Sequence, residues 1–262
     1  MNSFVVTAMI AGLAVTVAGL VVQLLGHMLF VRFGDDDTKD VAGVVGFRVS
    51  AIFGIAVGLI FAASAAYLIE AKRNLQEEAR LIGTLQFLAA EAPTLVNRGK
   101  VQQNLTEFAE RSMRELDAEV GPDSAGRVTS NLLIESCRGM APADADTDEV
   151  RWTKAEFQRS CSMLIDLRGK KLIGSREGLV SKPFWVFFGI CFGFLAFLFG
   201  VFALTPINVV FASVFYFTTG ITGAIIYAAG NPYQEPGKVE SSPLMEALQN
   251  AGSTDSSSNG SR

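Results

Sequence analysis

The sequence predicts an all-α membrane protein with four transmembrane helices and a helical cytoplasmic domain between the second and third spans. Apolar residues make up 50% of its 262 residues, and 20 of them are Phe, which is unusual for a soluble domain. Two long stretches, residues 3–31 and 183–234, contain no charged residue. The charged part of the chain, residues 70–182, lies between them. This alternation is typical of spans that flank a domain outside the bilayer.

Residues 1–33 are predicted as the first span, because the uncharged stretch exceeds the roughly 20 residues that cross a bilayer. The stretch lacks the basic start and the cleavage site of a signal peptide. Residues 34–43 are predicted as an outer acidic loop. Residues 44–69, in which Arg48 is the only charged residue, are predicted as the second span.

Residues 183–229 are predicted to hold the third and fourth spans, separated by a turn at Thr205-Pro206-Ile207-Asn208. Residues 230–248 follow as a post-membrane turn and a short helix, which begins at Ser242-Pro243. The tail, residues 249–262, is rich in Ser, Gly and Asn and is predicted to be disordered.

The domain at residues 70–182 is predicted to be helical, and its first helix continues the second span to about Glu91. Further helices are expected near residues 100–119, 124–139 and 147–172. Val101, Leu105 and Phe108 lie on one face of the second of these four helices. Such faces have to be buried against one another or against neighbouring subunits.

Basic residues gather where this domain joins the spans, and they predict its orientation: Lys72, Arg73 and Arg80 at the entry, and Arg168, Lys170, Lys171, Arg176 and Lys182 at the exit. Basic residues beside span ends favour the cytoplasmic side. The domain and both termini are therefore predicted to be cytoplasmic, in a bacterial inner membrane. Because the cytoplasm is reducing, Cys137, Cys161 and Cys191 are predicted to be free thiols.

The second span carries a stripe of small residues at every fourth position, namely Gly46, Ser50, Gly54, Gly58, Ala62 and Ala66. Small residues let another helix backbone approach closely in lipid. The stripe indicates a second span at the centre of a bundle, or lining an axis. Ordinary packing within one subunit explains such a stripe as well, and is the commoner reason for one.

Larger apolar residues on other faces of the same span, Phe53, Val57 and Ile60, are candidates for a hydrophobic constriction around an axis. A role in lipid contact or in the protein core is the commoner fate of such residues.

Arg48 is a charged residue about 10 Å inside the outer boundary of the second span, and charges inside a span usually face protein or water. His27 and Gln23 on the first span reach a similar depth. The three are predicted to form an outer vestibule that attracts anions. In the alternative, Arg48 reaches the surface and His27 makes one interhelical hydrogen bond.

Several classes of function are disfavoured. The net charge of −4, without a basic patch, argues against nucleic acid. There is one His, and no nucleotide-binding loop, nucleophile elbow or zinc motif is present. Asp144, Asp146 and Asp148 lack the spacing of a calcium loop. Neither an enzyme nor a metal or cofactor is predicted.

The chain resembles the bestrophin-like family of bacterial membrane proteins. The resemblance is carried by Ile52-Phe53-Gly54 and Leu59-Ile60-Phe61, leading into Glu77-Glu78-Ala79-Arg80-Leu81-Ile82-Gly83-Thr84. Asn231-Pro232-Tyr233 followed by Ser242-Pro243-Leu244 resembles the closing pattern of the family, in which an acidic residue more often stands at the place of Asn231. The resemblance implies kinship with bestrophins, which are pentameric anion channels with a pore lined by the second span.

The leading expectation is therefore a homo-oligomeric ion channel, anion-selective, in the lipid bilayer, with small inorganic ions passing along the second span. The alternative is a membrane-anchored signalling or scaffold protein whose cytoplasmic helices bind a partner. A secondary transporter is a third reading, which the absence of a clear internal repeat weakens.

Overall fold

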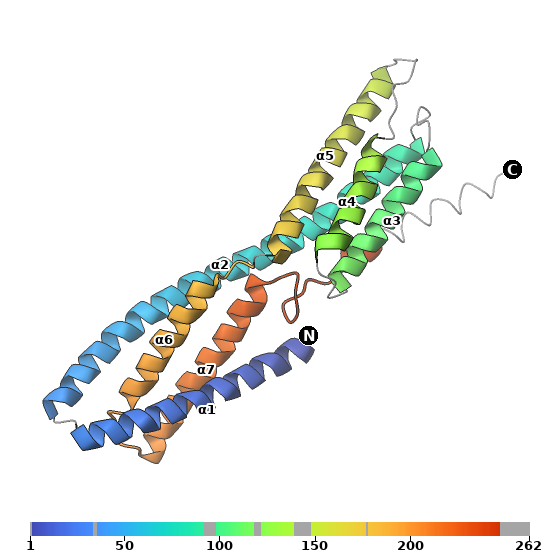
Figure 1. The fold of residues 1–262 in the computed structure, drawn as a ribbon. Helices are drawn as coiled ribbons and strands as arrows, with labels where there is room; N and C mark the ends of the chain where they lie inside the picture. The colour runs from blue at the N-terminus through green and yellow to red at the C-terminus, as the bar shows by residue number, and fades with distance from the viewer. Residues whose placement is uncertain are drawn as a thin grey trace. The chain divides into compact units, whose positions relative to one another are not determined.

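The computed structural model describes residues 2–33, 36–91, 98–117, 122–138, 148–176 and 178–246. Its regular elements are helices, in this order: α1 (Asn2–Phe33), α2 (Asp36–Glu91), α3 (Arg98–Asp117), α4 (Pro122–Arg138), α5 (Asp148–Arg176), α6 (Lys182–Phe199) and α7 (Pro206–Gly230) (Figure 1). Residues 242–246 are also helical. The described part of the chain contains no strand. The predicted disordered tail, Asp144 and Asp146 lie outside the described residues.

Four of the helices are long and apolar enough to cross a membrane: Phe4–Arg32 in α1, Lys39–Ala90 in α2, Lys182–Phe199 in α6 and Pro206–Gly230 in α7. These are the four stretches that the charge pattern singled out. The prediction of an all-α membrane protein with four spans is thereby confirmed.

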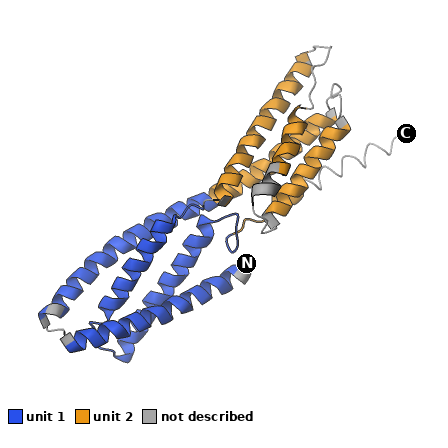
Figure 2. Ribbon diagram, viewed as in Figure 1, with its two compact units in different colours: residues 1–68, 178–237 blue, residues 69–177, 238–262 orange. Residues whose placement is uncertain are grey.

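The chain divides into two compact units (Figure 2). Unit 1 comprises residues 1–68 and 178–237, and unit 2 comprises residues 69–177 and 238–262. Helix α2 contributes to both, because no proline interrupts its 56 residues.

Within unit 1, helix α1 packs closely on α7 and α6, and glycines permit the approach. A methyl group at Gly220 of α7 would lie 2.8 Å from the carbonyl oxygen of Ala11, and one at Gly19 of α1 would lie 2.7 Å from the ring of Tyr216. At Gly26 a methyl group would collide with the carbonyl oxygen of Phe197 on α6. Glycine is needed at these positions because it is the only residue without a Cβ, so backbones can come into contact in lipid.

The end of α1, the start of α2 and the connection between α6 and α7 lie at the same end of unit 1 (Figure 1). Two boundaries differ from the sequence prediction there. Helix α2 already begins at Asp36, so most of the predicted acidic loop is helical; Asp37 in the first turn suits the positive end of the helix dipole. Helix α6 ends at Phe199, and the next helix begins at Pro206 behind Thr205, whose hydroxyl accepts from the backbone N–H of Asn208.

Unit 2 is a bundle of the second half of α2 with α3, α4 and α5, in which α3 packs on α4 and α4 on α5 (Figure 2). The predicted apolar face of α3 is buried at Val101, Leu105 and Phe108. Its neighbours supply further fully buried side chains, among them Leu81, Ile82 and Leu85 of α2, Leu133 of α4, and Phe157 and Leu164 of α5.

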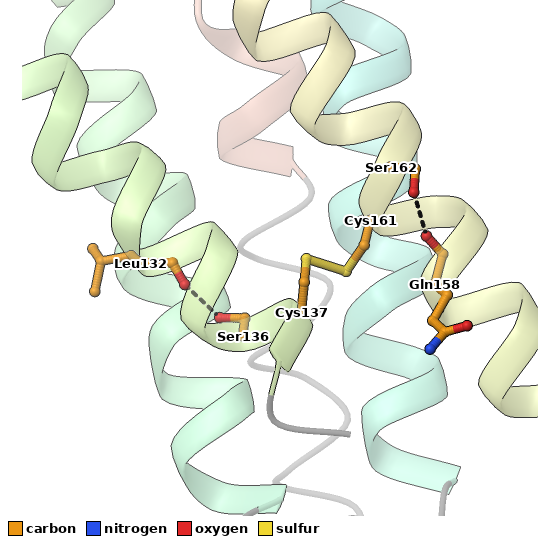
Figure 3. The surroundings of a disulfide bond; sticks show 6 residues. All are labelled: Leu132, Ser136, Cys137, Gln158, Cys161 and Ser162. Atoms are coloured by element: carbon orange, nitrogen blue, oxygen red, sulfur yellow. Dashed lines mark hydrogen bonds between the residues drawn. A yellow bond between two sulfur atoms is a disulfide. The ribbon is translucent and has the colours of Figure 1, made fainter. Parts of the chain in front are cut away.

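A disulfide joins Cys137, in the last turn of α4, to Cys161 of α5 (Figure 3). The prediction that these two cysteines are free thiols is therefore wrong for this structure. They are 24 residues apart in the chain, and only the packing of α4 on α5 brings their Cα atoms to 5.9 Å. Cys191 of α6 is a free thiol, as predicted.

Candidate functional site

The membrane-spanning part of α2 has two different sides. On the inward side Phe53 is 5% exposed, and its ring centroid lies 5.2 Å from that of Phe188 on α6. Val49 and Val57 pack against the same cluster, which includes Leu195. This side holds α2 to the rest of unit 1.

The opposite side of α2 is exposed among the residues that the structure describes. Ile55, about 160° around the helix from Phe53, is 66% exposed. A methyl group added at Gly54 or Gly58 would meet no atom of another element within 4 Å. Arg48 is also exposed on this side. We call Val44, Arg48, Ala51, Ile55, Gly58 and Ala62 the outward face of α2; each of them is exposed.

The stripe of small residues falls on both sides. Positions four residues apart rotate by about 40° per step on a helix of 3.6 residues per turn, so the stripe winds around α2. Gly46 and Ser50 line an apolar groove of about 200 Å³ with Leu198 and Phe202. Gly54, Gly58, Ala62 and Ala66 are exposed. Packing within one subunit therefore accounts for the first two residues of the stripe, whereas the last four are exposed within the part of the chain that the structure describes.

The three predicted constriction residues do not belong to the outward face. Phe53 and Val57 pack toward α6, as described above, and Ile60 is half-buried. That Phe53, Val57 and Ile60 form a constriction stays a prediction. Sequence spacing could not decide which face of α2 meets α6, because apolar residues occur on every face of this span.

The residues predicted for the outer vestibule have separate surroundings. The side-chain oxygen of Gln23, buried at 1% exposure, accepts a hydrogen bond of 3.1 Å from the hydroxyl of Tyr216 on α7. His27 Nδ1 lies 2.9 Å from the carbonyl oxygen of Gly200, which follows α6. Both side chains thus bond α1 to its neighbours, as the alternative reading expected of His27. Arg48 lies on the outward face of α2, and the vestibule itself stays a prediction.

The sequence reasoning missed a second polar site, in unit 2. Glu78 of α2 is only 3% exposed. It accepts a hydrogen bond of 2.6 Å from the hydroxyl of Ser112, and the ammonium of Lys171 lies 3.3 Å from its other oxygen. Lys171 also donates to the Ser112 hydroxyl at 2.7 Å. The neighbouring residue Glu77 pairs with Arg80 at the surface.

A second buried pair lies beside the first. The guanidinium of Arg168, 2% exposed, donates to Glu115, which also accepts a 2.5 Å hydrogen bond from Thr129. Nε and Nη1 of Arg168 are buried without a hydrogen-bond partner within the described part of the chain. We call Glu78, Ser112, Glu115, Thr129, Arg168 and Lys171 the buried ion-pair cluster; it links α2, α3, α4 and α5.

Burial and charge act in opposite directions on Lys171. Loss of solvation lowers the pKa of its ammonium below the ordinary value, and the nearby Arg168 lowers it further, whereas Glu78 and Glu115 raise it. The two acids and two bases of the cluster balance in charge, so the cost of burying each charge is offset only while its partner is present. The cluster therefore connects the four helices through paired buried charges.

The fold defines a class: helical membrane proteins with four spans and a helical bundle inserted between the second and the third. Within this class the family is identified by a family model for the Bestrophin-like domain, which matches residues 13–244. The chain belongs to the Bestrophin-like family. The family resemblance found in the sequence is thereby confirmed.

Solved structures share the fold over nearly the whole chain. A bacterial bestrophin homologue from Klebsiella pneumoniae, crystallised with a point mutation, matches with a TM-score of 0.58 at 10% identity, covering 94% of this chain and 97% of that one. A crystallised variant of a membrane protein matches with a TM-score of 0.59 at 11% identity, covering 96% and 98%. At such identities the likeness concerns the fold alone. No curated protein matches this chain.

Proposed function

We propose that this chain is one subunit of a homo-oligomeric ion channel in a bacterial inner membrane and that the outward face of α2 lines its pore. The observation that carries the proposal is the exposure of that face within the described part of the chain. Gly54 and Gly58 have no neighbouring element within 4 Å, and Ile55 is 66% exposed. Membership of the Bestrophin-like family supports a channel at the level of the family.

Arg48 argues against a purely lipid-facing role for this side of α2. A charged side chain inside a span costs about 2.5–3.5 kcal/mol on insertion scales, and such residues usually face protein or a water-filled cavity. Arg48 is the only charged residue on the outward face between Asp40 and Glu70. A ring of this residue around an axis would place positive charge in the pore, which favours anions.

The narrowest part of the proposed pore lies one to three turns below Arg48. Ile55 points outward in the present arrangement, while Phe53 and Val57 pack toward α6. For Phe53, Val57 and Ile60 to form the constriction predicted from the sequence, α2 would have to turn about its axis. Variants at Ile55 and at Phe53 therefore distinguish the two arrangements.

The test is reconstitution of the purified protein in liposomes, with chloride and potassium fluxes measured under a set gradient and the oligomer mass measured by light scattering. We expect a flux that favours chloride, and an Arg48→Gln variant that loses much of this preference. Arg48→Lys keeps the charge and is the matched control. Cation flux, or equal selectivity in all three proteins, would contradict the proposed role of Arg48. A monomeric protein that shows no ion flux would refute the channel proposal.

A specific observation favours a second function, a scaffold whose helical domain binds a partner. Unit 2 exposes large apolar side chains, including Phe87, Trp152 and Ile173, each more than 60% exposed. They are candidates for contact with a soluble protein or with another subunit. A stoichiometric soluble partner that copurifies with the wild type but not with a Trp152→Ser variant, in the absence of flux, favours the scaffold.

A further inference from the structure

The disulfide between α4 and α5 lies in the part of the chain that the charge pattern assigns to the cytoplasm. Bacterial cytoplasm keeps most thiols reduced, so a permanent disulfide is not expected there. The Cα atoms of Cys137 and Cys161 are 5.9 Å apart, within the usual range for disulfides of about 4.4–6.8 Å. The backbone thus places the two thiols where a bond forms without movement of either helix (Figure 3).

The two cysteines differ in access. Cys161 is 3% exposed, whereas Cys137 is half-buried in the last turn of α4. A small oxidant in solution therefore meets Cys137 first, and Cys161 is positioned to attack the product. This is the arrangement of an accessible thiol with a neighbouring resolving thiol.

We propose that Cys137 and Cys161 are a reversible redox pair that fastens α5 to α4 when oxidised and releases this link when reduced. The oxidant is a low-molecular-weight disulfide, RSSR. The Cys137 thiolate attacks one sulfur of RSSR, so that a mixed disulfide forms and one RS⁻ leaves. The Cys161 thiolate then attacks the Cys137 sulfur, which forms the protein disulfide and releases the second RS⁻. The two cysteines are oxidised, RSSR is reduced to two RSH, and the protons of the two protein thiols end on those products.

The disulfide acts on a helix that is otherwise held by noncovalent contacts, namely buried apolar side chains and two buried ion pairs. Arg168 and Lys171 of α5 follow Cys161 by seven and ten residues, which is roughly 10–15 Å along the helix. They bind Glu115 and Glu78 in the buried ion-pair cluster. Reduction removes the covalent attachment of α5 and leaves the cluster and the buried side chains Phe157 and Leu164 to hold it. Helix α5 ends at Arg176 and the third span, α6, begins at Lys182, so a loosened α5 is close in sequence to a transmembrane helix.

The experiment first determines the thiol state in intact cells of a Cys191→Ser variant, which retains only the proposed pair. Permeant and impermeant maleimides are compared. We expect thiols that react with the permeant reagent alone, and a disulfide that appears after the cells are treated with a small-molecule disulfide. The proposal would be overturned if the disulfide is present in untreated cells and its cysteines react with the impermeant reagent after reduction. Such a disulfide would be a permanent bond in an oxidising compartment.

The purified full-length protein is then titrated with reduced and oxidised glutathione, and hydrogen exchange of α5 is followed. A disulfide closing a loop of this size restrains the chain enough that we expect exchange in α5 to quicken on the order of tenfold or more upon reduction. Cys137→Ser should exchange at the fast rate under both conditions, and Cys191→Ser should behave as the wild type. No difference between the oxidised and reduced wild type would refute the release of α5.

Regulation of ion flux by the pair rests on the proposed channel function. We expect chloride flux to differ between oxidised and reduced proteoliposomes, and the difference to vanish in Cys137→Ser. If no flux is seen in either state, the channel proposal fails, while the redox pair is still judged by the cell labelling and by hydrogen exchange. If flux is present and the same in both states, the regulatory part of the inference is wrong.

Discussion

The ammonium of Lys171 lies 3.3 Å from the carboxylate of Glu78, and both side chains are buried in unit 2. Ser112 hydrogen-bonds to both of them. The pair connects α5 to α2 across 93 residues of sequence. Because neither charge can reach water, each depends on the other, and this dependence leads to the first two predictions.

Removal of one member of the pair should be far more damaging than removal of both. Lys171→Met alone, or Glu78→Leu alone, leaves an uncompensated buried charge and should lower the local stability of α5 by about 3–5 kcal/mol. The double variant should recover most of this loss. Hydrogen exchange of α5 amides in the full-length protein measures it. Arg114→Met, which removes an exposed ion pair with Glu110, is the control and should cost less than about 1 kcal/mol. Additive losses in the double variant would show that the two charges do not depend on each other.

The pH dependence of stability should reveal Lys171 once Glu78 is neutral. In Glu78→Gln the carboxylate that raises the pKa of Lys171 is gone, so burial lowers this pKa further. Between that lowered pKa and the ordinary lysine value of about 10.4, the unfolded chain binds a proton that the folded chain does not. The stability of Glu78→Gln should therefore rise with pH in this window, by at most about 1.4 kcal/mol per pH unit.

The double variant Glu78→Gln/Lys171→Met controls for the titration of all other groups. The difference in slope between it and Glu78→Gln belongs to Lys171. Equal slopes in the two proteins would mean that Lys171 keeps an ordinary pKa and is hydrated in the folded state.

The hydrogen bond between Tyr216 and Gln23 should stabilise the packing of α1 on α7. Tyr216 is fully buried, and its hydroxyl is 3.1 Å from the Gln23 oxygen. Tyr216→Phe should cost about 0.6–1.7 kcal/mol, the range for interhelical hydrogen bonds in membranes. Tyr227→Phe, at a position that is 43% exposed, is the control and should be near neutral. Unfolding in detergent measures the change in the free energy of unfolding for both variants. Equal changes would show that the hydrogen bond does not stabilise the packing of α1 on α7.

Two glycines of unit 1 should respond in opposite ways to a methyl group. Gly26→Ala would bring its Cβ against the Phe197 carbonyl oxygen, so the subunit should be destabilised by roughly 1–3 kcal/mol. Gly54→Ala meets no neighbouring element and should leave the stability of the subunit unchanged. If α2 meets other subunits or lines a pore, Gly54→Ala should instead change the oligomer mass or the flux. A substantial loss of monomer stability in Gly54→Ala would contradict the arrangement of α2.

Conductance should distinguish the two sides of α2. Ile55→Ala, on the outward face, should raise flux in proteoliposomes, because a smaller side chain widens a constriction and makes it less apolar. Phe53→Ala should chiefly destabilise unit 1, by about 3–5 kcal/mol, since Phe53 packs on Phe188. The reverse pattern, with flux altered by Phe53→Ala in a stable protein, would support the constriction predicted from the sequence.

The sequence by itself determined the four spans and the helical domain between them. Crossing a bilayer requires about 20 apolar residues in a row, so each span can be found within one short window. Cap signals are equally local, and Thr205-Pro206 begins α7, although residues 206–208, which the sequence assigned to the turn, are helical. The apolar face of α3 follows from its own spacing, and its side chains are buried.

Only the tertiary structure decided which side of α2 packs on α6, that Glu78 is buried with Lys171, and that Cys137 meets Cys161. Apart from Arg48, apolar residues stand on every face of this span, so no apolar periodicity marks the packed side, and Phe53 and Ile55 look alike in the sequence. Glu78 and Lys171 are 93 residues apart, and a charge pattern alone assigns each to solvent. These relationships depend on helices that are distant along the chain and adjacent in space, which no local pattern encodes.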